Sequence, residues 1–331
     1  MAQTRYEVTD IGTLPGLSAS YVCNVALNNR GQIAAYANNA ENPLAFAGDV
    51  PFLWKGPGQI QRLPTLPGAT DTLTIGMNDA GQISGMSGAV VWNDAHAVLW
   101  DQGRVFDLGT LPGDAGSDAG LISGSGLVVG DSYNADYSLY RGVYWDRSHR
   151  IHLLPGLPGA TLTQAYGVNN QGHAVGWSGT WESGWSGVLW KDGRVINLGS
   201  LGGAYCWPVY ISDRDEVCGE SITSDGGDHA FLWRNGQMID LGNFGNDVCG
   251  FAACVGNRGE VVGFSGAGID DVHTAHALLW QDGKMINLQD RLRPGSGWVL
   301  QQAMAINDRG QIAGTGWHNG QLRGFLMTPK D

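Results

Sequence analysis

HAFLWRNGQMIDLGNFG, residues 229–245, recurs along the chain with small changes. Close copies are AVLWDQGRVFDLGTLPG (97–113), GVLWKDGRVINLGSLGG (187–203) and HALLWQDGKMINLQD (276–290). Each copy places two short apolar runs around a turn that contains glycine, in three of the four as Asn-Gly or Asp-Gly, which is typical of two antiparallel strands joined by a hairpin. No stretch shows helical periodicity, so the sequence predicts an all-β protein.

The Leu-Trp element of this copy repeats at a spacing of about 45 residues, which suits a four-stranded propeller blade. It occurs as FLW (52–54), VLW (98–100), VYW (143–145), VLW (188–190), FLW (231–233), LLW (278–280) and FLM (325–327). The spacing predicts a seven-bladed β-propeller with four antiparallel strands in each blade, forming a single domain over residues 1–331. The approximate repeats are 12–63, 64–107, 108–153, 154–197, 198–240, 241–287, and 288–331 together with 5–11.

The N-terminal stretch RYEVTDIG (5–12) matches the fourth strand of the other repeats, whereas the last repeat ends at GFLMTPKD (324–331), just after its third strand. We therefore expect the N-terminal strand to complete the last blade. This pairing closes the ring and removes two free sheet edges. An open β-solenoid is the alternative architecture.

The repeats resemble those of the HAF-repeat ("extracellular HAF") β-propeller proteins, which are named for His-Ala-Phe before a strand. His229, Ala230 and Phe231 match this motif, while His96-Ala97-Val98 and His276-Ala277-Leu278 are near matches. The resemblance extends over nearly the whole chain and implies a β-propeller. It implies little about activity. The N-terminus MAQTRYEV lacks the features of a signal peptide, so we expect a cytoplasmic protein, or a secreted one if a leader was removed.

The composition argues against several classes of partner and ligand. The 331 residues carry a formal net charge of −12, which argues against a nucleic-acid partner, and no apolar run is long enough to span a membrane. Five cysteines without a CxxC pair argue against a metal knuckle and favour reduced thiols, with one disulfide possible. Cys206 and Cys249 are the best candidates for that disulfide or for a reactive pair. We expect a monomer.

Residues that recur in every repeat are predicted to serve the scaffold. A tryptophan ends the third strand of six repeats, and we expect it to pack between neighbouring sheets. A glycine recurs in the second strand, and we expect it to allow a close approach of sheets near the axis. These glycines are Gly85, Gly130, Gly176, Gly219, Gly263 and Gly314.

Other positions differ in every repeat, and they lie where the first two strands reach the variable loops. In the first strand they are Cys23, Leu73, Asp118, Gln164, Trp207, Phe251 and Gln302. In the second strand they are Tyr36, Met86, Asp131, Trp177, Glu220, Phe264 and Thr315. If the first strand is innermost, these side chains ring the mouth of an axial funnel that is acidic and lined with aromatic rings. Such pockets bind small molecules.

This funnel predicts a cofactor-independent enzyme that acts by acid/base chemistry on a neutral or cationic small organic molecule. Asp118, Asp131 and Glu220 are the catalytic candidates, because carboxyl groups in an apolar funnel acquire raised pKa values. The predicted substrate-binding residues are Tyr36, Met86, Gln164, Tyr166, Trp177, Trp207, Phe251, Phe264, Gln302 and Thr315. Cyclisation, elimination and hydrolysis all suit such a site.

The alternatives are a lectin-like propeller that binds a carbohydrate or small molecule without catalysis, and a protein-interaction platform. No metal site is predicted. Calcium stays open, because SDRDE (212–216) and GIDDVH (268–273) resemble calcium loops in composition although their spacing differs from an EF-hand.

Overall fold

The computed structural model describes residues 4–23, 25–39, 48–89, 95–268 and 273–330. These residues form strands β1 to β28 and one short 3-10 helix, η2 (Leu288–Arg291), so the predicted all-β class is confirmed. Within the described ranges, no helix is both long and apolar enough to cross a membrane.

Four sheets contain four antiparallel strands each. The first consists of β2 (Ala19–Tyr21), β3 (Ile33–Asn38), β4 (Val50–Trp54) and β5 (Ile60–Arg62). The second consists of β6 (Asp71–Met77), β7 (Ile83–Gly88), β8 (His96–Asp101) and β9 (Arg104–Asp107). The third consists of β10 (Gly116–Ile122), β11 (Val128–Tyr133), β12 (Tyr140–Trp145) and β13 (Ile151–Leu153). The fourth joins β26 (Trp298–Ile306), β27 (Ile312–His318) and β28 (Gln321–Lys330) to β1 (Arg5–Asp10).

The remaining strands form one sheet of twelve, in which three antiparallel groups of four are joined. The groups are β14 (Leu162–Val168), β15 (Ala174–Thr180), β16 (Gly184–Lys191) and β17 (Arg194–Gly199); β18 (Gly202–Ile211), β19 (Val217–Thr223), β20 (Asp228–Arg234) and β21 (Gln237–Gly242); and β22 (Cys249–Val255), β23 (Val261–Gly266), β24 (His276–Gln281) and β25 (Lys284–Asn287). Single parallel pairs, Trp185 with Tyr205 and Asp228 with Cys249, make the junctions. The third strand of one group therefore touches the first strand of the next.

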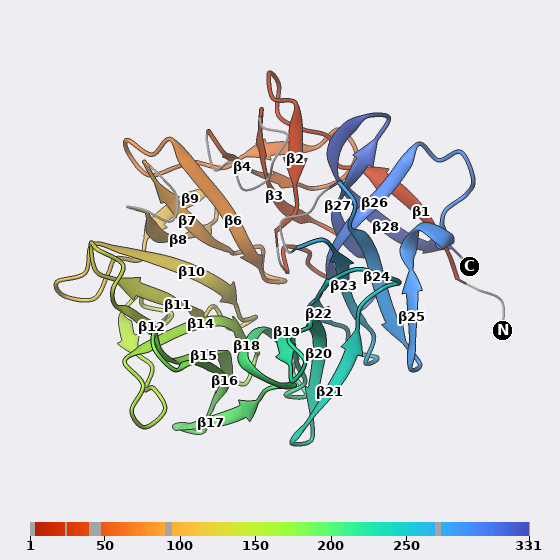
Figure 1. Ribbon diagram of the computed structural model, residues 1–331. Helices are drawn as coiled ribbons and strands as arrows, with labels where there is room; N and C mark the ends of the chain where they lie inside the picture. The colour runs from red at the N-terminus through yellow and green to blue at the C-terminus, as the bar shows by residue number, and fades with distance from the viewer. Residues whose placement is uncertain (1–3, 24, 40–47, 90–94, 269–272, 331) are drawn as a thin grey trace.

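The sheets are arranged in chain order around a central axis, and the two ends of the chain meet (Figure 1). Strand β1 pairs with β28 in an antiparallel register that runs from Arg5 opposite Lys330 to Asp10 opposite Phe325. The structure thus contains the expected pairing of the N-terminal strand with the last strand, which covers the free edge of β28.

The tryptophans that end the third strands pack in the interior, as expected. Trp54, Trp100, Trp145, Trp190 and Trp280 are buried, and Trp233 is partly buried. The indole nitrogen of Trp100 donates a hydrogen bond to the Pro64 carbonyl at 2.7 Å, and that of Trp190 donates to the Pro155 carbonyl at 2.7 Å. Both acceptors lie in the segment that leads into the repeat, so the ring ties the third strand to the entry of its own sheet.

Buried asparagines join the turns of consecutive sheets on the side of the ring that carries the short turns between first and second strands. The side-chain amide of Asn78 donates to the Ser123 carbonyl at 3.0 Å, and that of Asn169 donates to the Ser212 carbonyl at 3.1 Å. The amide of Asn307 donates to the Asn28 carbonyl at 3.0 Å, which connects the last sheet to the first. These bonds link neighbours where the strand ladders do not.

Replacing Asn307 with alanine is expected to lower the free energy of unfolding by about 2 kcal/mol, because a buried carbonyl and several backbone donors lose their partner. The Asn307 side-chain oxygen also accepts bonds from the Arg309 and Gln311 backbone nitrogens, at 3.1 and 3.0 Å. Urea unfolding measures the effect. Gln171→Ala, in an equivalent turn but exposed, is the control and should change stability by no more than about 0.5 kcal/mol. Equal effects of the two changes would contradict a stabilising role of the Asn307 side-chain hydrogen bonds.

Candidate functional site

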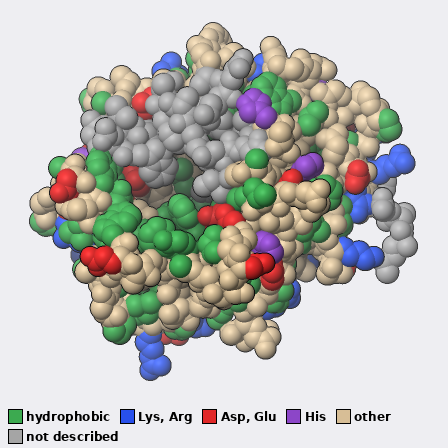
Figure 2. Space-filling model, viewed as in Figure 1, with side chains coloured by type: hydrophobic (Ala, Val, Ile, Leu, Met, Phe, Trp, Pro, Cys, Tyr) green, Lys and Arg blue, Asp and Glu red, His purple; other side chains and the backbone are tan. Residues whose placement is uncertain are grey.

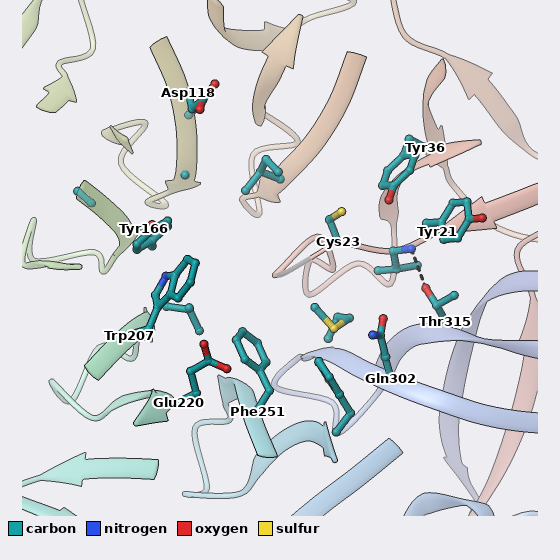
Figure 3. Close-up of a pocket in the computed structure, with 18 of the residues that line it drawn as sticks. Tyr21, Cys23, Tyr36, Asp118, Tyr166, Trp207, Glu220, Phe251, Gln302 and Thr315 are labelled. Atoms are coloured by element: carbon teal, nitrogen blue, oxygen red, sulfur yellow. Dashed lines mark hydrogen bonds between the residues drawn. The ribbon is translucent and has the colours of Figure 1, made fainter. Parts of the chain in front are cut away.

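A cavity of about 260 Å³ lies on the axis of the ring. Figure 2 shows hydrophobic side chains gathered around a hollow on this face, with acidic side chains beside it. The lining side chains come from strands of every sheet, and Figure 3 shows many of them converging on the same space. They are Tyr21, Val22, Cys23, Tyr36, Ile75, Asp118, Ala119, Gly120, Asp131, Ala165, Tyr166, Trp207, Val209, Glu220, Phe251, Phe264, Gln302, Met304 and Thr315.

The variable positions of the first and second strands face each other across the ladder, sheet by sheet. Asp118 is opposite Asp131, Trp207 is opposite Glu220, and Phe251 is opposite Phe264. Gln302 is likewise opposite Thr315. In the first sheet, Tyr21 rather than Cys23 is opposite Tyr36, although Cys23 also lines the cavity.

The recurring glycines explain how the first strand presents these side chains. A Cβ atom on Gly130 would lie 2.0 Å from the Asp118 carbonyl oxygen, and one on Gly219 would lie 2.0 Å from that of Trp207. The register of the first strand shifts within a few residues of this carbonyl, between Ala119 and Ile122 in the third sheet. The close approach is therefore made by the first strand of the same sheet, which corrects the expected approach between neighbouring sheets.

The predicted catalytic residues Asp118 and Asp131 come together as a buried pair. They are 5% and 3% exposed, respectively. Burial, followed by the charge of Asp131, raises the pKa of Asp118 well above its ordinary value, against a hydrogen bond with Tyr133. Burial raises the pKa of Asp131 to about 7, against a hydrogen bond from Gln164. Two coupled carboxyl groups of this kind hold a proton near neutral pH.

A chain of hydrogen bonds runs behind the cavity wall and ends on Asp131. The indole nitrogen of Trp177 donates to the Tyr166 hydroxyl at 3.1 Å, and that hydroxyl donates to the Gln164 side-chain oxygen. The Gln164 side-chain nitrogen then donates to a carboxylate oxygen of Asp131 at 3.2 Å. The chain fixes Asp131 and Tyr166 in place.

Three predicted substrate-binding residues do not line the cavity. Gln164 and Trp177 belong to the hydrogen-bond chain behind it and act as positioning residues. Met86 is fully buried in a hydrophobic cluster with Leu73, Tyr21 and Tyr36, because this sheet carries two apolar side chains at the variable positions and they pack against the neighbouring sheet. The other predicted residues, Tyr36, Tyr166, Trp207, Phe251, Phe264, Gln302 and Thr315, line the cavity with Asp118, Asp131 and Glu220.

Sequence reasoning missed a second layer of the cavity. Ile75, Gly120, Val209 and Met304 line it, and each follows a variable position of the first strand by two residues. Alternate residues of a strand face the same side, so the period of two could have found them. Sequence reasoning also missed Tyr21, which lines the cavity and stacks on Tyr36 with ring centroids 5.1 Å apart.

All five cysteines are free thiols, which agrees with the expectation of mainly reduced cysteines. Cys206 is buried, and burial raises the pKa of its thiol to about 12, which disfavours the reactive thiolate. The Cys249 sulfur instead lies 3.5 Å from a carboxylate oxygen of Asp228. Cys206 and Cys249 therefore do not form the disulfide that the sequence leaves possible, and the burial of Cys206 disfavours a reactive pair.

Within the described ranges, one group of side chains has the spacing of metal ligands. Glu220, Asp228 and Cys249 place ligand atoms within 4.8 Å of one another at the edge of the cavity. The calcium-like turn 212–216 differs, because the carboxylate of Asp215 bonds to His173 and Lys191, and that of Asp213 bonds to Asn170. Residues 269–272 of the other calcium-like stretch lie outside the described residues.

Aromatic rings also continue from the cavity wall to the surface. Trp177 stacks on Trp185 at 5.1 Å, and Trp185 contacts both Tyr205 at 4.5 Å and Trp181 at 6.2 Å between ring centroids. Trp181 is 56% exposed and Tyr205 is 43% exposed. Trp177, Trp185, Trp181 and Tyr205 are hereafter called the aromatic platform, which offers the exposed rings of Trp181 and Tyr205 outside the cavity.

Comparison with known proteins supports the fold alone. No protein-family model matches the chain, and no curated protein does. Among solved structures, the chain is similar to a streptogramin B lyase, with a TM-score of 0.55, 12% identity and 98% of each chain covered. It is also similar to the virginiamycin B lyase from Staphylococcus aureus, with a TM-score of 0.54, 10% identity, and 98% of this chain and 99% of that chain covered.

The β-propeller domain of the Trilobed protease from Pyrococcus furiosus is another such structure, with a TM-score of 0.54, 11% identity, and 93% of this chain and 95% of that chain covered. Together with the ring of four-stranded antiparallel groups, these likenesses show that the protein is a β-propeller.

Proposed function

We propose that this β-propeller is a cofactor-independent enzyme that acts by acid/base chemistry on a neutral or cationic small organic molecule in its axial cavity. The observation that carries the proposal is the buried Asp118–Asp131 pair, whose pKa values are raised so that one carboxyl group can give a proton while the other takes one. Glu220 is the third proton-transfer group. We also propose seven blades and a place among HAF-repeat proteins, which the repeat spacing supports.

The side chains that line the cavity suit different roles in the proposed reaction. The rings of Tyr36, Tyr166, Trp207, Phe251 and Phe264 would hold the body of the substrate, while Gln302 and Thr315 offer polar contacts. Elimination is the reaction type that uses the acid pair most directly. One carboxylate removes a proton from carbon, and the neighbouring carboxylic acid protonates the leaving group. Two of the similar structures are lyases by name, which is compatible with this reaction type.

A metabolite-conversion screen tests the proposal. The purified protein is incubated with an extract of its source organism, and consumption of each species is followed by mass spectrometry. We expect one species to be consumed, and Asp118→Asn or Asp131→Asn to slow its consumption about 100-fold or more, because each change removes a proton-transfer group. Glu220→Gln is tested in parallel, and EDTA should leave the rate unchanged.

Asp136→Asn is the matched control. Asp136 is fully exposed and lies outside the cavity lining, so its change should leave the conversion unaffected. Conversion that survives both Asp118→Asn and Asp131→Asn would overturn the catalytic roles. A compound that co-purifies unchanged with native protein and variants would show a binding protein instead.

The aromatic platform favours a second candidate function, the binding of a carbohydrate. Exposed tryptophan and tyrosine rings stack on the apolar faces of sugars, and Trp181 and Tyr205 present such rings. Retention on immobilised polysaccharides that is lost in Trp181→Ala, but kept in Asp118→Asn, would identify this function.

A further inference from the structure

We infer that the ligand of the axial cavity is an organic ammonium ion, either a protonated amine or a quaternary ammonium compound, bound between the carboxyl groups and the aromatic rings. This inference rests on the proposed function for the place of binding, and it narrows the substrate from a neutral or cationic molecule to a cation.

The first observation in favour of a cationic ligand is the charge of the cavity lining. Its lining contains Asp118, Asp131 and Glu220 but, among the described residues, no lysine, arginine or histidine. No cationic side chain contributes to the pKa of Asp118 or Asp131. A side-chain oxygen of Asp118 is buried without a hydrogen-bond partner, although the residue is 5% exposed. A buried carboxylate is stabilised either by a proton or by a cation, so a cationic ligand would supply the counter-charge that the lining lacks.

The aromatic rings carry the second step. Three ring pairs line the cavity: Tyr21 with Tyr36 at 5.1 Å, Tyr166 with Trp207 at 5.6 Å, and Phe251 with Phe264 at 5.3 Å between centroids. Ring faces attract cations, and desolvation strengthens the attraction. Glu220, Trp207 and Phe251 line the same part of the view in Figure 3, so the cavity combines an anionic group with aromatic rings.

The size of the cavity limits the cation. A volume of about 260 Å³ is slightly below the range typical of sites for drug-sized ligands, so the ammonium ion is small. An inorganic cation would leave the apolar ring faces largely unused, whereas alkyl groups on nitrogen fit against them.

Binding should depend on pH in a defined direction. The titratable groups near Asp131 are Asp118 on β10, Tyr133 on β11, Tyr137 in the turn that follows it, Tyr140 on β12, Tyr166 on β14, and Glu220 across the cavity on β19. Burial raises the pKa of Tyr133, Tyr140 and Tyr166, which therefore stay neutral near pH 7. A cation favours the ionised pair, so its binding releases a proton near neutral pH.

Isothermal titration calorimetry of the full chain tests the inference with choline and its neutral isostere 3,3-dimethylbutan-1-ol, which share one shape. At pH 8 we expect choline to bind at least about tenfold more tightly than the alcohol. The affinity for choline should fall by up to about tenfold for each pH unit below 7. Buffers of different ionisation enthalpy should report the released proton. Trp207→Leu and Asp131→Asn should weaken binding of choline more than that of the alcohol.

Trp181→Leu is the control, because Trp181 lies outside the cavity lining and its change should leave choline binding unaltered. Equal affinities for the two probes, tighter binding of the alcohol, or no choline binding at millimolar concentration would overturn the inference. Failure of this inference can be distinguished from failure of the enzyme proposal. A neutral metabolite consumed in the conversion screen would leave the enzyme proposal intact, whereas an ammonium ion bound and returned unchanged would leave only this inference.

Discussion

Gly130→Ala is expected to lower the free energy of unfolding by about 3 kcal/mol or more, because the added methyl group meets backbone on one side and an aromatic ring on the other. Its Cβ would lie 2.0 Å from the Asp118 carbonyl oxygen and 2.9 Å from a ring carbon of Trp145. Neither neighbour is the free end of a flexible side chain, so the first strand has to move. Urea unfolding followed by circular dichroism measures the change.

The matched control is Gly268→Ala. None of the described residues lies within 4 Å of a Cβ at Gly268, and its backbone is outside the left-handed region, so stability should change by no more than about 0.5 kcal/mol. The same movement should displace Asp118, and Gly130→Ala should therefore reduce ligand binding even in molecules that remain folded. If Gly130→Ala were as stable as the native protein, the glycine would have no such role.

Asp131→Asn is expected to stabilise the protein at pH 8 and to leave its stability unchanged at pH 3. The pKa of Asp131 rises from 3.8 to about 7 on folding. Because the folded pKa is the higher one, the native state keeps a proton that the unfolded state loses, and stability falls as the pH rises through this interval. At about 1.4 kcal/mol for each pH unit, the full loss is about 4 kcal/mol above pH 7.

Denaturant unfolding at a series of pH values measures the effect. The native protein should lose stability between about pH 4 and pH 7 relative to Asp131→Asn, and the two curves should run parallel above that interval. Asp136→Asn is the control, because Asp136 is fully exposed and hydrogen bonds with Ser138 lower its pKa. A native curve parallel to that of Asp131→Asn across the whole range would contradict the raised pKa.

The repeat made most of the fold predictable. Each hairpin carries its turn residues and its Leu-Trp element, so the strands and their antiparallel order follow from local pattern. The pairing of β1 with β28 was also predictable, because RYEVTDIG resembles the fourth strand that the last repeat lacks. The twelve-stranded sheet was not, since it depends on single parallel contacts such as Trp185 with Tyr205, which leave no trace in the repeat.

The candidate site was predictable where a position differs among repeats and its side chain is polar or aromatic, as with Asp118, Trp207 and Phe251. It was not predictable where packing decided the outcome. Met86 occupies an equivalent position, yet the hydrophobic effect draws it into the core beside Tyr36. Gln164 hydrogen-bonds to Asp131 and Trp177 stacks on Trp185. These contacts join different strands, so the pattern of one strand does not predict them.

The pairing of Arg5 with Lys330 also sets an order of events during synthesis. Strand β1 leaves the ribosome first, but its partner β28 is made last. At roughly 5–20 residues per second, β1 waits roughly 15 seconds to a minute for that partner. Sheets made entirely from neighbouring segments, such as β6 to β9, have all their strands long before then. The sheet that contains β1 and β28 is therefore the last of these sheets that can form, and until it does β1 lacks its partner strand.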